Sequence, residues 1–346
     1  MATEVTKIVD PGEGAGHDYH SLSLWEAGQQ KNLVTADEIA IAKCRATDGD
    51  ADTTYVEIDG WVTSSTQYIK IWTDPTESYR HPGKWDNTKY RLVTASGAMA
   101  IIEKYVRIYG LQVENTEGDW NTGAIKIAIP MPFVTIAYCI ITSTVANDVA
   151  YGGGLILIGY ISSSDSTNFV YNNILYDKPG TYGTAIGIED YNGTWHIRNN
   201  TIYGCALGIY GGSIITFYTK NNLISATHAY YAYNGEPFKD DDTYNDYNSI
   251  SENTNDPSIG SHGRYNQTFA FVDAANKNFH LASNDTGALG YGLNLYNDAA
   301  LPFQDDIDGQ DRGGAGAPWD IGADEYVSAG IKIPVAIHHY QQAGGL

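Results

Sequence analysis

Aromatic and basic side chains recur at matching places in three successive repeats of the sequence. Each repeat contains a short strand-like segment whose outward positions hold a ring, followed by a second ring or a cation. Rings stack on sugar faces, and cations bond sugar hydroxyls or carboxylates. The pattern predicts a glycan-binding groove formed by Phe169, Tyr171, His196, Arg198, Tyr218 and Lys220. The alternative interpretation is an ordinary solvent-facing sheet of strand-forming residues.

Polysaccharide cleavage needs groups that this pattern lacks. A hydrolase uses two carboxylates about 5–9.5 Å apart, which neighbouring coils about 4.8 Å apart could supply. The one acidic pair inside a regular repeat, Glu189 and Asp190, consists of strand neighbours that point to opposite faces. A lyase needs a base with a depressed pKa, for which Arg198 or Lys220 is the alternative. The sequence therefore identifies no catalytic residue and favours a non-enzymatic role.

Two acidic segments have the spacing of calcium ligands. The first places acids at positions 1, 3 and 5 of a loop and Asp59 at position 12, although Thr53 stands where such a loop needs glycine. The second packs three acids into one turn. The candidate Ca²⁺ ligands are Asp48, Asp50 and Asp52 in the first segment, and Asp306, Asp308 and Asp311 in the second. No other cofactor is expected.

The side chains above must be carried by elements that repeat along the chain. One series of five-residue segments ends at Ile127, Ile158, Ile188, Ile209 and Ala232, and a second ends at Tyr138, Asn172, Asn199 and Asn221. Each segment of the second series follows its counterpart in the first by 11 to 14 residues. Two strands per repeat at a steady offset, with insertions confined to turns, are typical of stacked coils joined by right-handed crossovers.

These repeats predict an all-β chain, a single-stranded right-handed parallel β-helix (a solenoid) with a short N-terminal helical cap and an irregular C-terminal cap. We expect residues 1–45 to form the N-terminal cap, 46–300 the parallel β-helix, 301–328 a closing segment and 329–346 an extended tail. The cap helix is expected at residues 22–31, with Ser23 and Glu26 spaced as a capping box.

Stacked coils should align equivalent side chains in columns. Ile127, Ile158, Ile188 and Ile209 are predicted to form one inward column. The Asn doublets that begin at positions 172, 199 and 221 are predicted to form bends, because Asn tolerates the left-handed backbone conformation. Their amides, stacked one above another, should form a ladder along the axis.

The tail alternates apolar side chains, Ile331, Ile333, Val335 and Ile337, with other residues. Pro334 suits an edge strand because it cannot donate to a ladder. An apolar edge of this kind is costly to leave exposed. The tail is therefore predicted to add a strand to another subunit or to a partner protein, with folding back onto its own β-helix as the alternative.

Charge and hydropathy bear on partners and location. The formal net charge is −21, which repels phosphate backbones, so no nucleic acid is expected to bind. No apolar run reaches the roughly 18 residues of a membrane span, and the first residues lack the features of a signal peptide. Three cysteines cannot form a disulfide framework, and Cys139, inside an apolar strand, is expected to be a buried free thiol.

Five segments resemble a known group of proteins. DYHSLSLWEA at residues 18–27 and ADEIAIA at 36–42 are similar to the opening of pectate-lyase-like β-helix surface proteins of environmental bacteria and tailed phages. FVDAANKNFHL at 271–281, DIDGQDR at 306–312 and WDIGADEY at 319–326 resemble the closing segment of choice-of-anchor bacterial β-helix proteins. The resemblance implies the β-helix fold and a surface setting, and no catalytic signature comes with it.

Together, the resemblance and the missing catalytic pair favour a structural or adhesive surface protein. We expect a virion component of the tail-fibre, tailspike or capsid-decoration type, located in a phage particle or at an extracellular surface. Its expected partners are other virion or surface-assembly subunits, further copies of the chain in a homo-oligomer, and polysaccharide. Two alternatives stay open: a secreted polysaccharide lyase or glycoside hydrolase, and a bacterial cell-surface β-helix protein.

Overall fold

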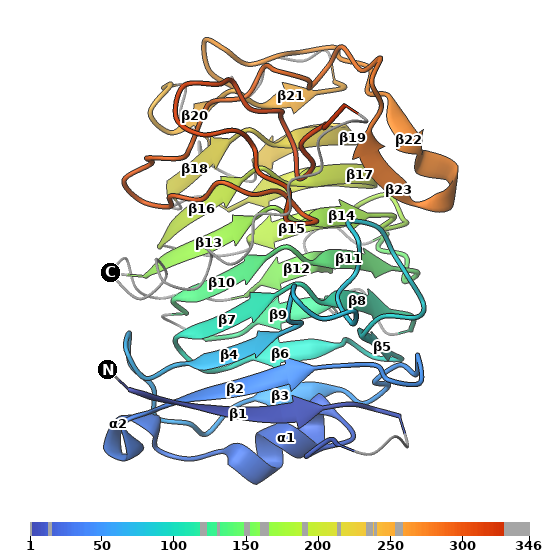
Figure 1. Ribbon diagram of the computed structural model, residues 1–346. Coiled ribbons are helices and arrows are strands. Elements are labelled where there is room, and N and C mark those ends of the chain that lie inside the picture. The colour runs from blue at the N-terminus through green and yellow to red at the C-terminus, as the bar shows by residue number, and fades with distance from the viewer. Residues whose placement is uncertain are drawn as a thin grey trace.

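The chain winds into a single-stranded right-handed parallel β-helix, with its coils stacked from the N-terminal to the C-terminal end (Figure 1). The predicted fold class is confirmed. The computed structural model describes residues 2–12, 16–117, 123–129, 132–148, 153–159, 166–188, 193–212, 216–232, 238, 241–252 and 259–328. The predicted tail, with Ile331, Ile333, Val335 and Ile337, lies outside these residues, as does the pair Glu189 and Asp190.

Equivalent strands of successive coils pair in parallel, and three strands in succession make one coil. The first face, sheet A, has the order β1 (Thr3–Val9), β2 (Glu38–Cys44), β4 (Ile69–Trp72), β7 (Val106–Tyr109), β10 (Val134–Ala137), β13 (Thr167–Tyr171), β16 (Thr194–Arg198), β18 (Thr216–Lys220) and β20 (Asn245–Asp246). The second face contains β5 (Arg91–Thr94), β8 (Gln112–Asn115), β11 (Ile140–Ser143) and β14 (Ile174–Tyr176).

The third face is continuous with the second at the C-terminal end of the solenoid. It contains β3 (Val56–Ile58), β6 (Met99–Ile101), β9 (Ile125–Ile127), β12 (Gly154–Ile158) and β15 (Thr184–Ile188). Two long strands, β17 (Thr201–Gly211) and β19 (Leu223–Ala232), belong to both faces, and β21 (Ser249–Ile250) pairs with β19. Pairing shifts register at Tyr203 and Cys205, where β17 turns from one face to the other.

Alternate side chains on the strands point inward and stack in columns, which is why the core can continue from coil to coil. Ile127 aligns with Ile158, and Ile158 with Ile188, as predicted. Ile209 does not continue this column, because it aligns with Ile186. The prediction was wrong by two residues, the period of a strand, so Ile209 is still fully buried in the core.

The Asn doublets form the bends between sheet A and the second face. Asn172, Asn199 and Asn221 have φ angles of 50°, 49° and 57°, the left-handed conformation that was predicted for them. The second Asn of each doublet points inward and builds the ladder. Asn173 Nδ2 donates to Asn200 Oδ1 (3.0 Å), Asn200 Nδ2 to Asn222 Oδ1 (3.0 Å) and Asn222 Nδ2 to Asn248 Oδ1 (2.9 Å).

Helix α1 (Leu22–Gln29) covers the N-terminal end of the solenoid, and a short second helix, α2 (Leu33–Ala36), follows it (Figure 1). Leu22 and Trp25 are buried. The predicted cap residue was wrong: Ser21, not Ser23, is the N-cap, and its Oγ accepts a hydrogen bond from Leu24 N (3.1 Å). Glu26 accepts one from Trp61 Nε1 (3.0 Å) and so ties the helix to the first coils instead of closing a capping box.

The C-terminal cap consists of a hairpin and a strap. The hairpin, β22 (Phe271–Asp273) and β23 (Asn278–Leu281) with the 3₁₀ turn η1 (Ala274–Asn276) between them, packs its rings on Tyr176 and Tyr203 of the second face. The strap, residues 293–326, lies against the outside of the bends. Leu293 N donates to Asn221 Oδ1 (2.8 Å), and Asn172 Nδ2 donates to Asp305 O (2.7 Å).

Within the described part of the chain, α1 is 8 residues long and no helix has the length and apolar character of a membrane span. Cys44, Cys139 and Cys205 are all buried and free, so the predicted state of Cys139 is confirmed.

Candidate functional site at the C-terminal end of sheet A

The six predicted groove residues lie together on the outer surface of sheet A, in two adjacent columns. Parallel pairing places Phe169 beside His196 and His196 beside Tyr218. Their rings stack at centroid distances of 5.1 Å and 4.7 Å, and Tyr244 adds a fourth ring at 4.8 Å. Because each ring uses its faces on its neighbours, this column offers mainly ring edges to a ligand.

The second column is polar and continues one residue further than the sequence suggested. It runs through Tyr171, Arg198, Lys220 and Asp246. The strap covers its middle: Tyr171 packs against Phe303, and Arg198, which is 3% exposed, forms an ion pair with Asp298 (2.5 Å). Tyr171, His196 and Arg198 are therefore buried, whereas Phe169, Tyr218 and Lys220 are partly exposed.

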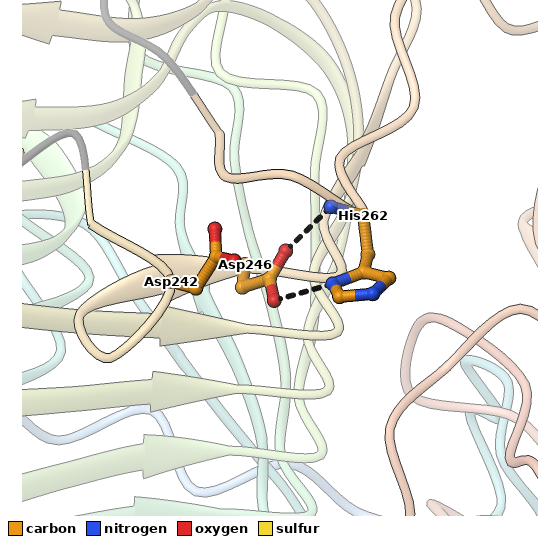
Figure 2. Close-up of side chains that lie close together, drawn as sticks. All are labelled: Asp242, Asp246 and His262. Atoms are coloured by element: carbon orange, nitrogen blue, oxygen red, sulfur yellow. Dashed lines mark hydrogen bonds and ion pairs between the residues drawn. The ribbon is translucent and has the colours of Figure 1, made fainter.

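Three further side chains meet beside the exposed end of these columns. Asp242 and Asp246 lie on the segment that leads into and through β20, and His262 approaches from the following loop (Figure 2). All their ligand atoms lie within 4.8 Å of one another. Asp246 is buried, whereas the side chain of His262 is 54% exposed.

Hydrogen bonds hold this cluster in one arrangement. His262 donates from its backbone N to Asp246 Oδ1 (2.9 Å) and from Nδ1 to Asp246 Oδ2 (2.9 Å), as the dashed lines in Figure 2 show. Tyr247 N also donates to Asp246 Oδ1 (2.9 Å), and the ring of Tyr247 stacks on His262 at 4.4 Å. Asp242 accepts hydrogen bonds from the backbone N (2.7 Å) and Oγ of Ser261.

The local charges alter the protonation of the site. Burial and the nearby Arg198 guanidinium lower the pKa of Lys220. Burial, with Arg198 again contributing, lowers the pKa of His196 to about 4, so this imidazole is neutral near pH 7 and accepts a hydrogen bond from Arg198 Nη2 (3.1 Å). The two hydrogen bonds from Ser261 lower the pKa of Asp242. The site therefore presents the carboxylate of Asp242 and the amino group of Lys220 at its surface, with the neutral imidazole of His196 buried beneath the strap side of the columns.

The sequence predicted the columns but missed Asp242, Asp246 and His262. Asp246 could have been predicted from the sequence. Tyr247 and Asn248 occupy the place of a fourth Asn doublet, and Asn248 continues the ladder. The residue before that bend then extends the column of Arg198 and Lys220. His262 had no such signal, because it belongs to no repeat and reaches the site through a loop.

The predicted calcium ligands do not gather as two sets of three. Asp48 and Asp50 are exposed, whereas Asp52 is buried and accepts hydrogen bonds from Leu22 N (2.7 Å) and Thr54 N (3.1 Å). Burial raises the pKa of Asp52. Its observed role is to hold the start of α1.

In the second acidic segment, only one of the three predicted ligands joins a cluster of possible ligand atoms. Asp306 is buried and accepts hydrogen bonds from Gln310 N (2.7 Å) and Glu325 N (3.0 Å). Asp311 is exposed and accepts one from Gly313 N (2.9 Å). Asp308 lies with His280 and Asp324, both outside the predicted set.

A groove of about 530 Å³ lies apart from these sites, at the register shift of β17. It is lined by Lys178, Pro179, Gly180, Tyr203, Gly204, Cys205, Ala206, Ser225, Ala226, Thr227 and Ser251. Small side chains and backbone dominate this lining, and Cys205 is a buried thiol whose pKa burial raises to about 12. Such a thiol is not a nucleophile.

Comparison with known proteins adds no family. No protein-family model matches the chain, and no curated protein matches it. The fold and the geometry described above are therefore the basis on which a function is proposed.

Proposed function

We propose that the protein is a structural or adhesive surface protein whose exposed site at the end of sheet A binds polysaccharide without cleaving it. One observation carries this proposal: the strap covers Tyr171 and Arg198 but leaves Tyr218, Lys220, Asp242 and His262 at the surface. A hydroxyl-rich ligand needs hydrogen-bond donors and acceptors held in fixed positions, and this site offers both.

The chemistry of the carboxylates argues for binding over hydrolysis. A general acid must keep its proton at working pH, which requires a raised pKa. The pKa of Asp242 is lowered, because Ser261 stabilises its ionised form. Asp246 uses both oxygens to accept hydrogen bonds from Tyr247 and His262. The pair therefore lacks the acid that a glycosidase requires.

Binding is tested with immobilised neutral polysaccharides and with polygalacturonate, measuring retention of the purified chain by affinity electrophoresis. Lys220→Ala and Asp242→Ala each remove one exposed polar group and should weaken retention about tenfold, as expected for the loss of about 1.4 kcal/mol. Asp50→Ala, an exposed acid near the N-terminal end, is the matched control. Equal retention of all three variants on every polysaccharide that binds the parent would refute the site.

A polysaccharide lyase or hydrolase is the second candidate, and one observation favours it. Asp246 fixes the ring of His262 through Nδ1, which leaves Nε2 as the free basic nitrogen of a half-exposed imidazole. An oriented imidazole of this kind is a general base. Release of reducing ends or of unsaturated sugar products, lost in His262→Ala, would establish the enzyme and replace the binding proposal.

The setting is also part of the proposal. We propose that the chain belongs to a virion or to an extracellular surface, where it assembles with other subunits and with further copies of itself. A rigid solenoid with one exposed polar site suits the display of that site from a particle or a cell. The resemblance of the chain ends to β-helix proteins of tailed phages and environmental bacteria supports this setting. Finding the chain in purified virions by mass spectrometry would establish the first location.

A further inference from the structure

A second group of possible ligands lies within the C-terminal cap, where the hairpin meets two parts of the strap. His280 comes from β23, Asp308 from a turn in the middle of the strap, and Asp324 from the end of the strap. Their ligand atoms all lie within 4.8 Å of one another. The side chains of His280 and Asp308 are 19% and 20% exposed, and Asp324 is 3% exposed.

His280 Nε2 is a buried nitrogen without a hydrogen-bond partner among the described residues. Asp308 Oδ2 is 3.5 Å away, too far for a hydrogen bond of normal strength. Two ligands that each lie about 2.0–2.1 Å from a tetrahedral zinc ion are separated by about 3.4 Å. The distance between these two atoms therefore matches that between two ligands of one metal ion better than it matches a hydrogen bond.

The other atoms of the three side chains are oriented for ligation. His280 Nδ1 donates to Asn278 Oδ1, which leaves the lone pair on Nε2. Asp324 accepts a hydrogen bond from Leu281 N at Oδ2 (2.6 Å), and Asp308 accepts hydrogen bonds from Gln310 Nε2 (2.9 Å to each oxygen). Outer hydrogen bonds of this kind fix the tautomer and direction of metal ligands.

Backbone closes one side of this group. A Cβ atom on Gly83 would stand 2.4 Å from His280 Nε2 and 3.3 Å from Asp308 Cβ, and Gly83 has a φ of +70°. Any larger residue would fill the space beside Nε2. The glycine therefore preserves a small gap at the orphaned nitrogen.

Two carboxylates share this small group. Asp324 is 3% exposed and the side chain of Asp308 is 20% exposed, so both carboxylates are largely removed from solvent. The guanidinium of Arg312, in the same strap, is already used by Glu325 and by the backbone carbonyls of Gly322 and Ala323. A buried carboxylate pair is costly unless a cation offsets it.

We propose that His280, Asp308 and Asp324 bind a divalent transition-metal ion of the zinc type, which fastens the strap to the hairpin. An imidazole ligand selects such ions over Ca²⁺ and Mg²⁺, which take oxygen ligands. Three protein ligands leave a fourth position for water. The cluster of Asp242, Asp246 and His262 lacks a buried nitrogen of this kind, because His262 Nδ1 is hydrogen-bonded to Asp246 and the side chain of His262 is 54% exposed.

The test uses Co²⁺ and Zn²⁺ on the full chain after chelator treatment. The parent should bind one equivalent of Co²⁺ here, with the visible absorption of a four-coordinate ion, and Zn²⁺ should displace it. His280→Gln and Asp324→Asn should abolish that absorption and weaken Zn²⁺ binding more than about tenfold, since losing even an outer partner costs at least that much. Asp311→Asn, an exposed acid of the same turn, should change neither.

Two controls separate this site from others. His262→Gln should leave the Co²⁺ spectrum unchanged, because that imidazole belongs to the other cluster. Circular dichroism checks that each variant is folded, and Asp324→Asn, nearly identical in shape, covers the case in which His280→Gln is not. A parent chain without Co²⁺ absorption, or a folded Asp324→Asn variant with the parental spectrum, overturns the proposal. Polysaccharide retention is measured separately and does not depend on it.

Discussion

A single buried lysine, Lys178, lowers the stability of the folded solenoid because its charge is removed from solvent. Lys178 is 1% exposed, and its Nζ donates to Ser143 Oγ at a long 3.4 Å. Burial lowers the pKa of Lys178 to about 8. Below that pH the folded state must hold a largely desolvated charge, whereas the unfolded chain solvates the same charge freely.

The first prediction concerns pH and this residue. Because the folded pKa lies below the unfolded value of 10.5, the penalty is complete below about pH 8 and disappears as pH rises to about 10.5. Lys178→Met should raise the free energy of unfolding at pH 7 by up to about 3 kcal/mol, the value of a shift of this size. Urea titrations of both chains at pH 7 and pH 10 check it. A gain that is the same at both pH values would contradict the role of charge.

At the scale of elements, the two residues of each Asn doublet have different structural roles. The inner residue supports the solenoid: Asn222 accepts hydrogen bonds from Asn200 N and Nδ2, and donates to Ile197 O and Asn248 Oδ1. The outer residue holds the strap, as Asn221 does by bonding both the N and the O of Leu293. The solenoid and its cap are thus joined along one line of bends.

The second prediction separates these two roles. Asn222→Ala leaves several buried groups without partners, at about 1–3 kcal/mol each, and should lower the midpoint of global unfolding. Asn221→Gly keeps the left-handed backbone (φ 57°) and removes the side-chain contacts to the strap, together with one hydrogen bond to Asn199 Oδ1 (3.2 Å). It should speed amide exchange at Leu293 while the strands of the solenoid keep their protection. Hydrogen-exchange mass spectrometry measures both, and equal effects of the two variants would contradict the division.

The elements also show where sequence reasoning succeeds and where it stops. Period-2 alternation and the Asn doublets predicted the coils, because both patterns repeat. Alternation cannot distinguish Ile186 from Ile188 as the neighbour of Ile209, since all three point inward. The site was half predicted for a similar reason: Lys220 follows the repeat, whereas His262 arrives from a loop, and no local pattern shows that the strap covers Arg198.

At the scale of the whole molecule, acidic side chains concentrate where the strap meets the solenoid. Asp305, buried against Tyr138 Oη (2.8 Å), has its pKa raised to about 7 by burial. Burial likewise raises the pKa of Glu325 to about 8. Docking of the strap therefore depends on protonation, although part of its contact with the solenoid is apolar.

The third prediction follows from these pKa values. A carboxyl group with a raised folded pKa stabilises the folded state fully below its unfolded value, near 4, and this contribution is lost as pH rises through the folded value. With a chelator present, the strap should be protected from amide exchange at pH 5 and less protected at pH 9, after correction for intrinsic rates. Asp305→Asn, which resembles the protonated form, should reduce the difference. An unchanged difference would assign the effect to other groups.

The fourth prediction concerns assembly. The alternating apolar residues of the tail predict an edge strand on a neighbouring subunit. Deleting residues 330–346 should leave the circular dichroism spectrum of the β-helix in place and abolish the proposed oligomer. Light scattering of the two chains measures this. A truncated chain that keeps its oligomeric state would indicate that the tail packs on its own β-helix and not on another subunit.

The line of bends under the strap also has a mechanical consequence. Tyr138, Asn172, Asn199 and Asn221 belong to consecutive coils, and each has a hydrogen bond to the strap. A pull along the solenoid axis loads these bonds together, in shear, so the strap shares the tension that would otherwise separate one coil from the next. A sideways pull on the strap loads them one after another and peels it off. The molecule should therefore resist stretching more strongly than it resists the stripping of its own cap.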